Sequence, residues 1–318
     1  MRARVMQHQS AHSGPSGPPD KSPLFSVILP THNRADMLRR AVNSVLAQTF
    51  NNFELIIVDD GSNDDTPAYL GGLDDVRIRI IRNEISVGAA AARNKAVNIA
   101  SGRYVSFLDD DDEYLPSFLE LTAGIMEGAS PEVGFCWSGI MNVRDDTNGE
   151  NKIGEGIWDP GAHAGQDRAR LFLLRRQIGT NCGLTVRRSC FGKIGLFDEV
   201  LRAAEDTDFL IRLSQEYDYA VVREILVKVH RHNRGNLTVY GPHMAAAYSR
   251  ILEKNTETLG RDTGAWREMH YKTGWLHYHA GDKASGRSYL LKALRRSPFH
   301  IKIWAMLLVL ECPGKAGN

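Results

Sequence analysis

Two clusters of acidic residues give the clearest indication of chemistry in this sequence. One pair, Asp59 and Asp60, directly follows the apolar run FELIIV, and a row of four aspartates directly follows the apolar run YVSFL. The four are Asp109, Asp110, Asp111 and Asp112. Like charges this close repel one another, and a divalent cation would relieve the repulsion, because Mg²⁺ and Mn²⁺ take carboxylate oxygens as ligands. The pattern therefore predicts a site for Mn²⁺ or Mg²⁺ in the row of four.

A helix N-terminus is the alternative explanation for these acids. The stretch YLPSFLELTAGIM that follows them is typical of a helix, and Asp112 and Glu113 would interact favourably with the positive end of its dipole. Capping does not need four acids, however, and it leaves Asp109 and Asp110 crowded against the apolar end of the preceding strand. We therefore favour the cation. Its remaining ligands are expected to be a nucleotide's phosphates, since such ions are usually held by one or two carboxylates plus substrate phosphates.

The sequence lacks the loops that most often bind nucleotide phosphates. No G-x-G-x-x-G follows the first apolar run, no G-x-x-x-x-G-K-[ST] occurs, and the stretch VGAAAARN offers a single glycine. These absences argue against a dinucleotide-dependent dehydrogenase and a P-loop NTPase. They favour a metal-dependent diphosphate site.

The neighbouring residues predict the elements that would position the acids. The expected elements are strands at 25–30, 53–58, 76–81 and 104–108 and helices at 34–50 and 88–100. Gly102 is expected to close the second helix in a left-handed conformation. Strands that alternate with helices of about a dozen residues indicate a mostly parallel α/β sheet, in which ligands bind beyond the carboxyl ends of the strands. The two acidic clusters should therefore meet at one rim.

Composition and charge are those of an ordinary globular protein. The 318 residues are 42% hydrophobic and 24% charged, and the 39 basic and 38 acidic residues nearly cancel, so the overall charge indicates no nucleic-acid partner. The four cysteines lack metal-ligand spacing and are interpreted as reduced thiols. No apolar run approaches the ~18 residues of a membrane-spanning helix, and residues 1–22 are typical of a disordered tail rather than a signal peptide. We expect a cytoplasmic protein.

Six motifs, in this order and spacing, resemble those of family-2 glycosyltransferases. They are SVILPTHNR, ELIIVDDGSND, GAAAARNKA, GRYVSFLDDDDEYLP, GLFDE and EDTDFLIRL. The resemblance covers about residues 24–240 and implies a GT-A fold, a Rossmann-like, mixed and mostly parallel sheet flanked by helices. It also implies an inverting, metal-dependent transfer of a sugar from a nucleotide-sugar, most commonly a UDP-sugar, to an acceptor hydroxyl, in polysaccharide or glycoconjugate biosynthesis.

The resemblance implies roles for residues around the donor. Pro30, Thr31 and His32, at the end of the first strand, would line the nucleoside pocket. Asp60 would contact the base, and Arg93 of the A-R-N motif would lie near the donor.

The same resemblance assigns the metal. Asp109 and Asp111 would form the D-x-D motif, Asp111 being the best candidate ligand, and Asp110 between them would reach the ribose. The basic stretch VHRHNRGNLT resembles a loop in which a histidine completes the metal shell or meets phosphate. His232 is our choice for this position and His230 competes for it, although either could be an ordinary surface residue.

The catalytic pair implied by the resemblance is Glu205 and Asp206, with Asp206 as the base that takes the acceptor proton. A helix cap ahead of FLIRL is the alternative role for Asp206. No Q-x-x-R-W follows the pair, which argues against a processive polymer synthase.

Three segments are expected along the chain: the tail 1–22, a glycosyltransferase domain at 23–240 and a helical C-terminal extension at 241–318. The domain would divide into a nucleotide-binding half, 23–128, and an acceptor and catalytic half, 129–240. The acceptor would be a carbohydrate or a lipid-linked sugar. The basic and apolar end LLKALRRSPFHIKIWAMLLVL has two interpretations, a helix docked on the body or a peripheral contact with the inner face of a membrane.

Two other functions compete with glycosyl transfer. A sugar-1-phosphate nucleotidyltransferase also uses a parallel sheet and Mg²⁺, but it would need a Gly-rich basic loop where PTHNRADM stands. A non-catalytic module that binds nucleotide-sugars would not need both acidic motifs.

Overall fold

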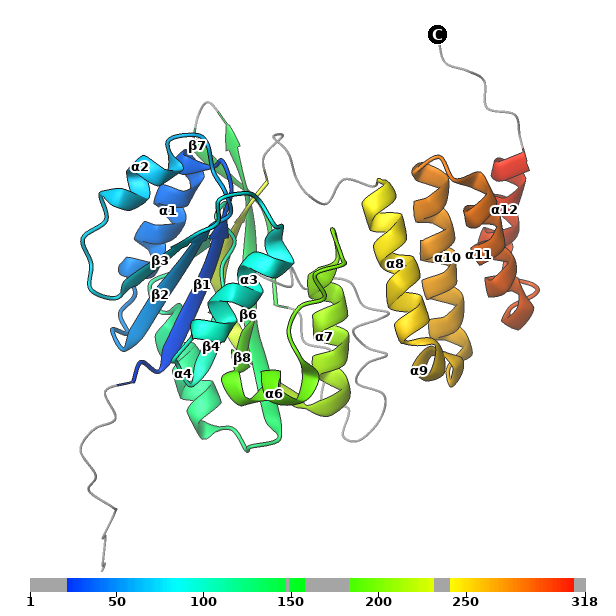
Figure 1. The fold of residues 1–318 in the computed structure, drawn as a ribbon. Helices are drawn as coiled ribbons and strands as arrows, with labels where there is room; N and C mark the ends of the chain where they lie inside the picture. The colour runs from blue at the N-terminus through cyan, green and yellow to red at the C-terminus, as the bar shows by residue number, and fades with distance from the viewer. Residues whose placement is uncertain (1–21, 147–148, 158–182, 232–240, 312–318) are drawn as a thin grey trace, which may run out of the picture.

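The computed structural model of the protein describes residues 22–146, 149–157, 183–231 and 241–311 (Figure 1). The described strands form one nine-stranded sheet in the order β3-β2-β1-β4-β8-β6-β9-β5, with β7 paired to β6. Helices cover both faces of this sheet, and a separate group of helices follows it.

The first half of the sheet is parallel. Its elements are β1 (Phe25–Thr31), α1 (Ala35–Leu46), β2 (Phe53–Asp59), α2 (Thr66–Gly71), β3 (Ile78–Arg82), α3 (Ala89–Ile99) and β4 (Tyr104–Phe107). Strand β1 lies between β2 and β4, and β2 pairs with β3. Parallel neighbours need a crossover connection, and α1 and α3 supply it after β1 and β3. All the expected strands and helices of this half are therefore present.

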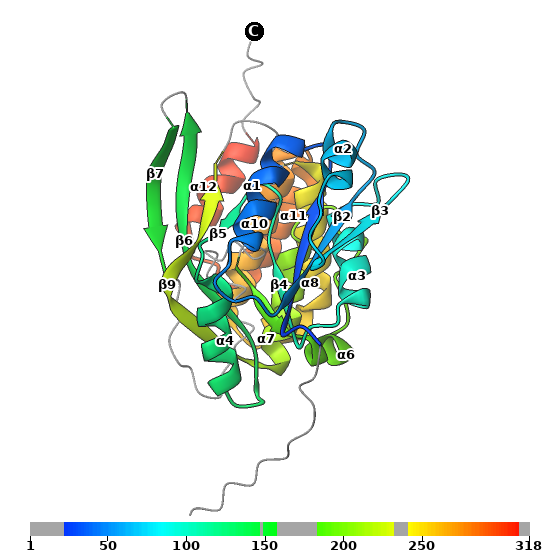
Figure 2. The ribbon, with the colours of Figure 1, turned by 90° about the vertical axis from the view of Figure 1, so that its left-hand side faces the viewer.

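The second half adds mostly antiparallel strands. Its elements are β5 (Glu113–Tyr114), α4 (Phe118–Gly128), β6 (Val133–Asp146), β7 (Gly149–Gly156), β8 (Thr185–Arg187), the 3₁₀ turn η1 (Arg188–Cys190), α6 (Phe191–Ile194), α7 (Glu205–Glu216) and β9 (Asp218–His230). Strand β8 is antiparallel to β4 and to β6, whereas β6 and β9 run parallel. In Figure 2 the long strands β6, β7 and β9 form the edge of the sheet opposite β3. This arrangement confirms the mixed α/β sheet flanked by helices.

Alternation along the strands builds two apolar layers. In β1, Phe25, Val27 and Leu29 face one cluster, which includes α1 and α4, while Ile28 faces the other, which includes α3, α6 and α7. Successive side chains of a strand point to opposite faces, so a strand with buried apolar side chains on both faces must be covered on both. The carboxyl ends of β1, β2 and β4 consequently emerge between the two helical layers.

Gly102 does not close α3 in a left-handed conformation as expected. Residue Ala100 ends the helix in an extended conformation, and Gly102 is absent from the described glycines that have a positive φ. A Cβ at Gly102 would instead lie 2.5 Å from the backbone nitrogen of Ser26 and 2.6 Å from the carbonyl carbon of Phe25. Glycine is required here because two backbone segments approach closely, not because of φ.

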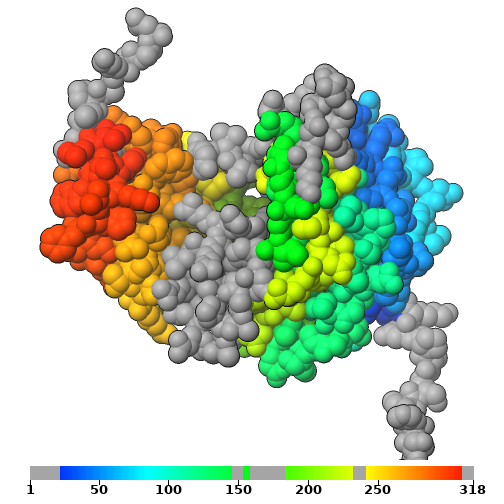
Figure 3. Space-filling model, turned by 180° about the vertical axis from the view of Figure 1, so that it is seen from behind, coloured from blue at the N-terminus to red at the C-terminus, as the bar shows by residue number. Residues whose placement is uncertain are grey.

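The C-terminal part is helical, as expected, over the described residues 241–311. It contains α8 (Pro242–Lys254), α9 (Thr256–Gly260), α10 (Thr263–His279), α11 (Lys283–Arg296) and α12 (Ile301–Glu311). Figures 1 and 3 show these helices on the opposite side of the molecule from α1, α2 and the parallel strands. Among the described helices, none has the length and apolar character needed to cross a bilayer.

An ionic seam joins α8 to the sheet domain. Lys254 Nζ lies 2.5 Å from the carboxylate of Asp208 in α7 and 3.1 Å from that of Asp198, which also accepts a hydrogen bond of 2.8 Å from Arg250. Asp208 is fully buried and is paired on its other side with Arg212 at 2.9 Å. Apolar residues of α8 and α10 extend the same cluster that contains α7. The extension therefore packs directly on the helix that carries the expected catalytic pair.

Candidate active site

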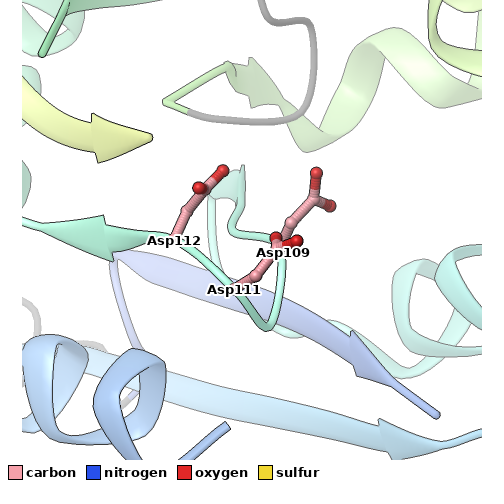
Figure 4. A group of neighbouring side chains, drawn as sticks. All are labelled: Asp109, Asp111 and Asp112. Carbon is pink, nitrogen blue, oxygen red and sulfur yellow. The ribbon is translucent and has the colours of Figure 1, made fainter. Parts of the chain in front are cut away.

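Three carboxylates of the loop that follows β4 lie close together. Oxygen atoms of Asp109, Asp111 and Asp112 all lie within 4.8 Å of one another, and Asp109 and Asp112 point to the same side of the loop (Figure 4). Carboxylate oxygens are the ligands that Mg²⁺ and Mn²⁺ prefer. The donor set therefore fits a hard divalent cation. Asp109 and Asp111 are the two ligands expected from the sequence, and helix capping was the alternative role for Asp112.

Helix capping does not explain Asp112 or Glu113. The following helix, α4, begins only at Phe118, and its N-cap residue, Ser117, makes no side-chain capping bond. Asp112 accepts a hydrogen bond of 2.9 Å from the backbone nitrogen of His230. Glu113 Oε1 lies 2.7 Å from His230 Nε2. The end of β9 thereby holds the far side of the acidic loop, and the capping alternative was wrong.

His230 is buried and takes part in this network, while His232 lies outside the described residues. The choice between them as a metal ligand stays a prediction.

Arginine and threonine side chains from the end of β1 hold the near side of the loop. Arg34 donates hydrogen bonds of 3.0 Å to both Asp110 and Asp111, and Thr31 donates one of 2.8 Å to Asp110. Arg40 of α1 donates to the backbone oxygen of Asp111 at 3.3 Å. The repulsion within the row of four is therefore partly offset by protein cations.

Burial raises the pKa of two of these aspartates. The pKa of Asp110 is raised to about 6 by burial, although Arg34 opposes the shift. Burial also raises the pKa of Asp109 against the opposing effect of Arg93. A further cation nearby would stabilise the ionised form of both carboxyl groups and so lower their pKa values again.

Arg93 joins the acidic loop to the second acidic motif. Its guanidinium donates at 2.7 Å to Asp109 and at 2.8 Å to Glu205, which opens α7, and its side chain is only 5% exposed. The two carboxylates are far apart in sequence, and the guanidinium's planar fork lets one side chain bind both. The D-x-D and E-D motifs expected from the sequence thus belong to one site.

Asp206 lies in the first turn of α7 and not at its cap. The helix begins at Glu205, and its N-cap residue is Ala204, which has a left-handed φ of 54°. A left-handed conformation costs a non-glycine residue roughly 1–2 kcal/mol, and such strain is found most often at functional sites. Burial, followed by the charge of Glu205, raises the pKa of Asp206 to about 7. A carboxylate with this pKa is suited to proton transfer near neutral pH.

Asp60, which follows β2, organises the loop that leads into α3. It accepts hydrogen bonds from the backbone nitrogens of Val87 and Gly88 at 2.9 and 2.8 Å and from the side chains of Asn83 and Ser86 at 2.6 and 2.7 Å. Burial acts to raise the pKa of Asp60, but these hydrogen bonds outweigh it and the pKa is lowered. A carboxylate has about four lone-pair sites, so most of its acceptor capacity is already used within the protein.

The end of β1 lies beside Asp60, as the sequence led us to expect. His32 is exposed, and its Nδ1 lies 2.8 Å from the backbone oxygen of Asp60, so this nitrogen carries the proton and donates. Pro30 pairs with Val58 across the strands and is half-buried. Asn33 follows with a left-handed φ of 54°. The chain turns sharply here, between the two acidic clusters.

Apart from Arg93, sequence reasoning missed the basic residues that pair with these acidic segments. Arg34 and Arg40 contact aspartates more than 70 positions away, and Lys254 reaches α7 from the C-terminal helices. One signal was available for Arg34. It lies three residues after a buried strand whose end was already expected at the acidic rim, and cations stabilise clustered carboxylates.

Comparison with known proteins gives a consistent result. Residues 26–194 match the family model described as "Glycosyl transferase family 2". Over 243 residues the chain is 31% identical to the "Putative colanic acid biosynthesis glycosyl transferase WcaA" of Escherichia coli K12, covering 76% of this chain and 84% of that protein. Over 103 residues it is 41% identical to the "UDP-Glc:alpha-D-GlcNAc-diphosphoundecaprenol beta-1,3-glucosyltransferase WfgD" of Escherichia coli, covering 32% of this chain and 41% of that protein.

Solved structures of glycosyltransferases share the fold. The chain resembles S. aureus TarS 1–349 in complex with UDP-GlcNAc, with a TM-score of 0.58, 17% identity, and coverage of 86% of this chain and 88% of that one. It also resembles the mannosyltransferase PcManGT from Pyrobaculum calidifontis in complex with GDP-Man and Mn²⁺, with a TM-score of 0.52, 17% identity, and coverage of 92% and 81%. These likenesses confirm the GT-A fold with C-terminal helices.

Proposed function

The chain belongs to glycosyl transferase family 2 and is a glycosyltransferase, and from that premise we propose the reaction it carries out. The enzyme transfers a sugar from a UDP-sugar to an acceptor hydroxyl, with inversion at the anomeric carbon and with Mn²⁺ or Mg²⁺ as cofactor. The acceptor is a carbohydrate or a lipid-linked sugar in the assembly of a polysaccharide or glycoconjugate. The names of the relatives, which include colanic acid biosynthesis and a UDP-Glc-dependent transfer to a diphosphoundecaprenol acceptor, support this proposal.

One observation carries the proposal more than any other. The Arg93 guanidinium donates to Asp109 at 2.7 Å and to Glu205 at 2.8 Å. One buried side chain thus links a candidate metal ligand, Asp109, to the neighbour of the candidate catalytic base. A non-catalytic module that only binds nucleotide-sugars would not require the E-D motif at this position. A site that must bring a sugar donor and an acceptor hydroxyl together would need both.

Asp109 and Asp111 hold the cation in this proposal, and Asp112 joins them because its oxygen lies within the same 4.8 Å group. The chemistry supplied by a bound cation is Lewis-acid stabilisation of the charge that develops on the departing diphosphate. His232 is retained as a proposed further ligand.

Asp206 acts as the base. Its carboxylate takes the proton of the acceptor hydroxyl while the acceptor oxygen forms its bond to the anomeric carbon. The bond between that carbon and the diphosphate oxygen breaks in the same displacement, and the nucleoside diphosphate leaves. A positioned base of this kind contributes roughly 10²–10⁴-fold to the rate. Glu205 is held by Arg93 and, through its charge, helps to raise the pKa of Asp206 towards neutrality.

The nucleoside lies along the end of β1 in this proposal, against Pro30, Thr31 and His32. Asp60 lies on the opposite side of the nucleoside and contacts its nucleobase. Because Asp60 already accepts hydrogen bonds from the loop around Ser86, a hydrogen bond from the nucleobase would replace one of these. The Ser86 hydroxyl is the donor that can rotate away. Asp110 reaches the ribose from between the metal ligands.

We also retain the division of the chain as a proposal. Residues 23–240 form the transferase domain, with nucleotide-binding and acceptor halves that divide near residue 128, and residues 241–318 form the extension. The proposed place of action is the cytoplasmic side of a membrane, where a lipid-linked acceptor would be accessible.

A transfer assay tests the reaction. The purified chain is incubated with UDP-glucose or UDP-N-acetylglucosamine, a diphosphate-linked N-acetylglucosamine acceptor, and either Mn²⁺ or EDTA. Transfer that needs the metal and is abolished in Asp111→Ala and Asp206→Asn supports the proposal, with Arg103→Gln as a surface control. Full activity in either variant contradicts the assigned role. Pyrophosphate release from a nucleoside triphosphate and a sugar 1-phosphate would instead indicate a nucleotidyltransferase.

A further inference from the structure

Helix α12 is apolar on two opposite faces. One face, Ile303, Met306 and Leu307, is buried against Leu290, Ala293 and Leu294 of α11. A helix that only docks on its neighbour needs one apolar stripe and carries polar residues opposite. The second apolar face therefore requires a separate explanation.

The second face is exposed. Ile301 is 82% exposed, Trp304 51%, Leu308 64% and Val309 48%, and Phe299 in the turn before the helix is 92% exposed. The spacing of residues 301, 304 and 308 places these side chains on one stripe of the helix. Figure 1 shows α12 as an outer helix, at the far end of the molecule from the parallel strands. Contiguous exposed apolar surface of this kind marks an interaction site.

Taken together, helices α11 and α12 are strongly basic. Residues 283–311 contain one acid, Glu311, and six lysines and arginines, which are Lys283, Arg287, Lys292, Arg295, Arg296 and Lys302. Arg295 and Arg296 end α11 just before Phe299, and Lys302 lies in the first turn of α12, all three exposed. The whole chain has a formal net charge of only +1. The positive charge is thus concentrated in the two helices that carry the exposed apolar side chains, and Lys302 lies between Ile301 and Trp304 in the first turn of α12.

We propose that the exposed stripe of α12 and the basic residues beside it dock the enzyme on an anionic lipid bilayer, with α12 lying in the plane of the interface. Apolar side chains on one face with lysine and arginine at its margin are the features of interfacial helices. At 11 residues α12 is about 17 Å long, too short to cross the hydrocarbon core of ~30 Å. The inference rests on the proposed function in one respect, that the acceptor is linked to a lipid.

A second copy of the chain fits this surface less well. A two-fold symmetric contact brings the same patch of each copy together. Lys302, between Ile301 and Trp304 in this patch, would then lie close to its own counterpart, and like charges held together in an interface oppose association. Anionic head groups offer the charge that complements this basic pair of helices.

Vesicle sedimentation tests the proposal without any sugar donor. The full chain is mixed with vesicles of phosphatidylcholine alone or of phosphatidylcholine with phosphatidylglycerol, at low and high salt. We expect binding to the anionic vesicles that weakens with salt. The double variant Trp304→Ser/Leu308→Ser should bind at least ~10-fold more weakly, since each side chain withdraws apolar surface from water on docking. Arg295→Gln/Lys302→Gln should lose roughly fivefold for each charge.

Matched variants in the sheet domain provide the controls. Val76 and Ile85 are exposed apolar residues there, at 102% and 76%, so Val76→Ser/Ile85→Ser should bind as the wild type does. A second variant of α12, Ile301→Ser/Val309→Ser, should also bind anionic vesicles more weakly. It leaves intact the hydrogen bond from the Trp304 indole to the backbone oxygen of Pro298.

Three results would overturn the proposal. They are no binding of the wild type to anionic vesicles, equal binding to both vesicle types, and a dimer in solution that becomes a monomer in Trp304→Ser/Leu308→Ser. Sugar transfer to a soluble acceptor analogue, measured in parallel, separates this outcome from a failure of the proposed reaction.

Discussion

Replacing Arg93 with methionine should destabilise the protein strongly, because Arg93 holds two acidic motifs together. Its guanidinium donates to Asp109 at 2.7 Å and to Glu205 at 2.8 Å, and the three side chains are 5%, 31% and 14% exposed. Breaking a buried ion pair by removing one partner costs about 3–5 kcal/mol. Since Asp109 is partly exposed to solvent, we expect the lower end, a loss of roughly 3 kcal/mol in the free energy of unfolding.

Urea denaturation of the wild type and the variant measures this loss. Arg103→Met is the matched control, because Arg103 pairs with Glu127 at 3.0 Å while 60% exposed and should contribute no more than about 1 kcal/mol. Arg93→Lys should recover only part of the loss, since an ammonium group lacks the fork that binds two carboxylates. A cost for Arg93→Met no larger than that of Arg103→Met would refute the inference that this residue ties the two motifs together.

Three further predictions follow from the same structure. The rate of transfer should rise about tenfold per pH unit below pH 7 and level off above it, because Asp206, with its pKa raised to about 7, must lose its proton to act as a base; a flat profile from pH 5 to 8 would contradict this. Lys254→Met should lower the free energy of unfolding by about 1–3 kcal/mol by removing one partner of the buried Asp208, and unchanged stability in urea would argue against the seam. Gly102→Ala should destabilise by at least about 1–3 kcal/mol through its clash with β1, whereas Gly124→Ala, with open space around it in α4, should be neutral or stabilising; equal midpoints for the two would disprove the close approach.

The parallel half of the fold was predictable from the sequence because its signals are local. The strand at 53–59 is apolar except for Glu54 and Asp59 and is buried at every position, so its run LIIV alone indicates a central strand. The second half gave weaker signals. β5 has only two residues and β8 three, and their places in the sheet are fixed by pairing with β9, β4 and β6 rather than by their own composition.

The acidic parts of the site were predictable for the same reason, whereas of its basic residues only Arg93 was expected, and without its partners. Asp60 and Asp109 follow strands whose ends share a rim, so topology alone brings them near each other. Arg34 and Arg93 are also close to expected elements, but which carboxylates they bind depends on side-chain reach and on packing between distant segments. Lys254 is further removed, because its partner in α7 could be known only once the C-terminal helices were placed.

The most direct test of the account is whether UDP and a divalent cation bind the acidic loop together. Calorimetric titration of UDP in the presence of Mn²⁺, compared with EDTA, should give tight binding only with the metal. The variants Asp109→Asn and Asp111→Asn should weaken that binding at least ~10-fold, by removing a carboxylate ligand, and should leave the residual binding in EDTA unchanged. Equal affinity for UDP with Mn²⁺ and with EDTA, or wild-type affinity in both variants, would contradict the central claim that these aspartates hold a cation for the nucleotide's diphosphate.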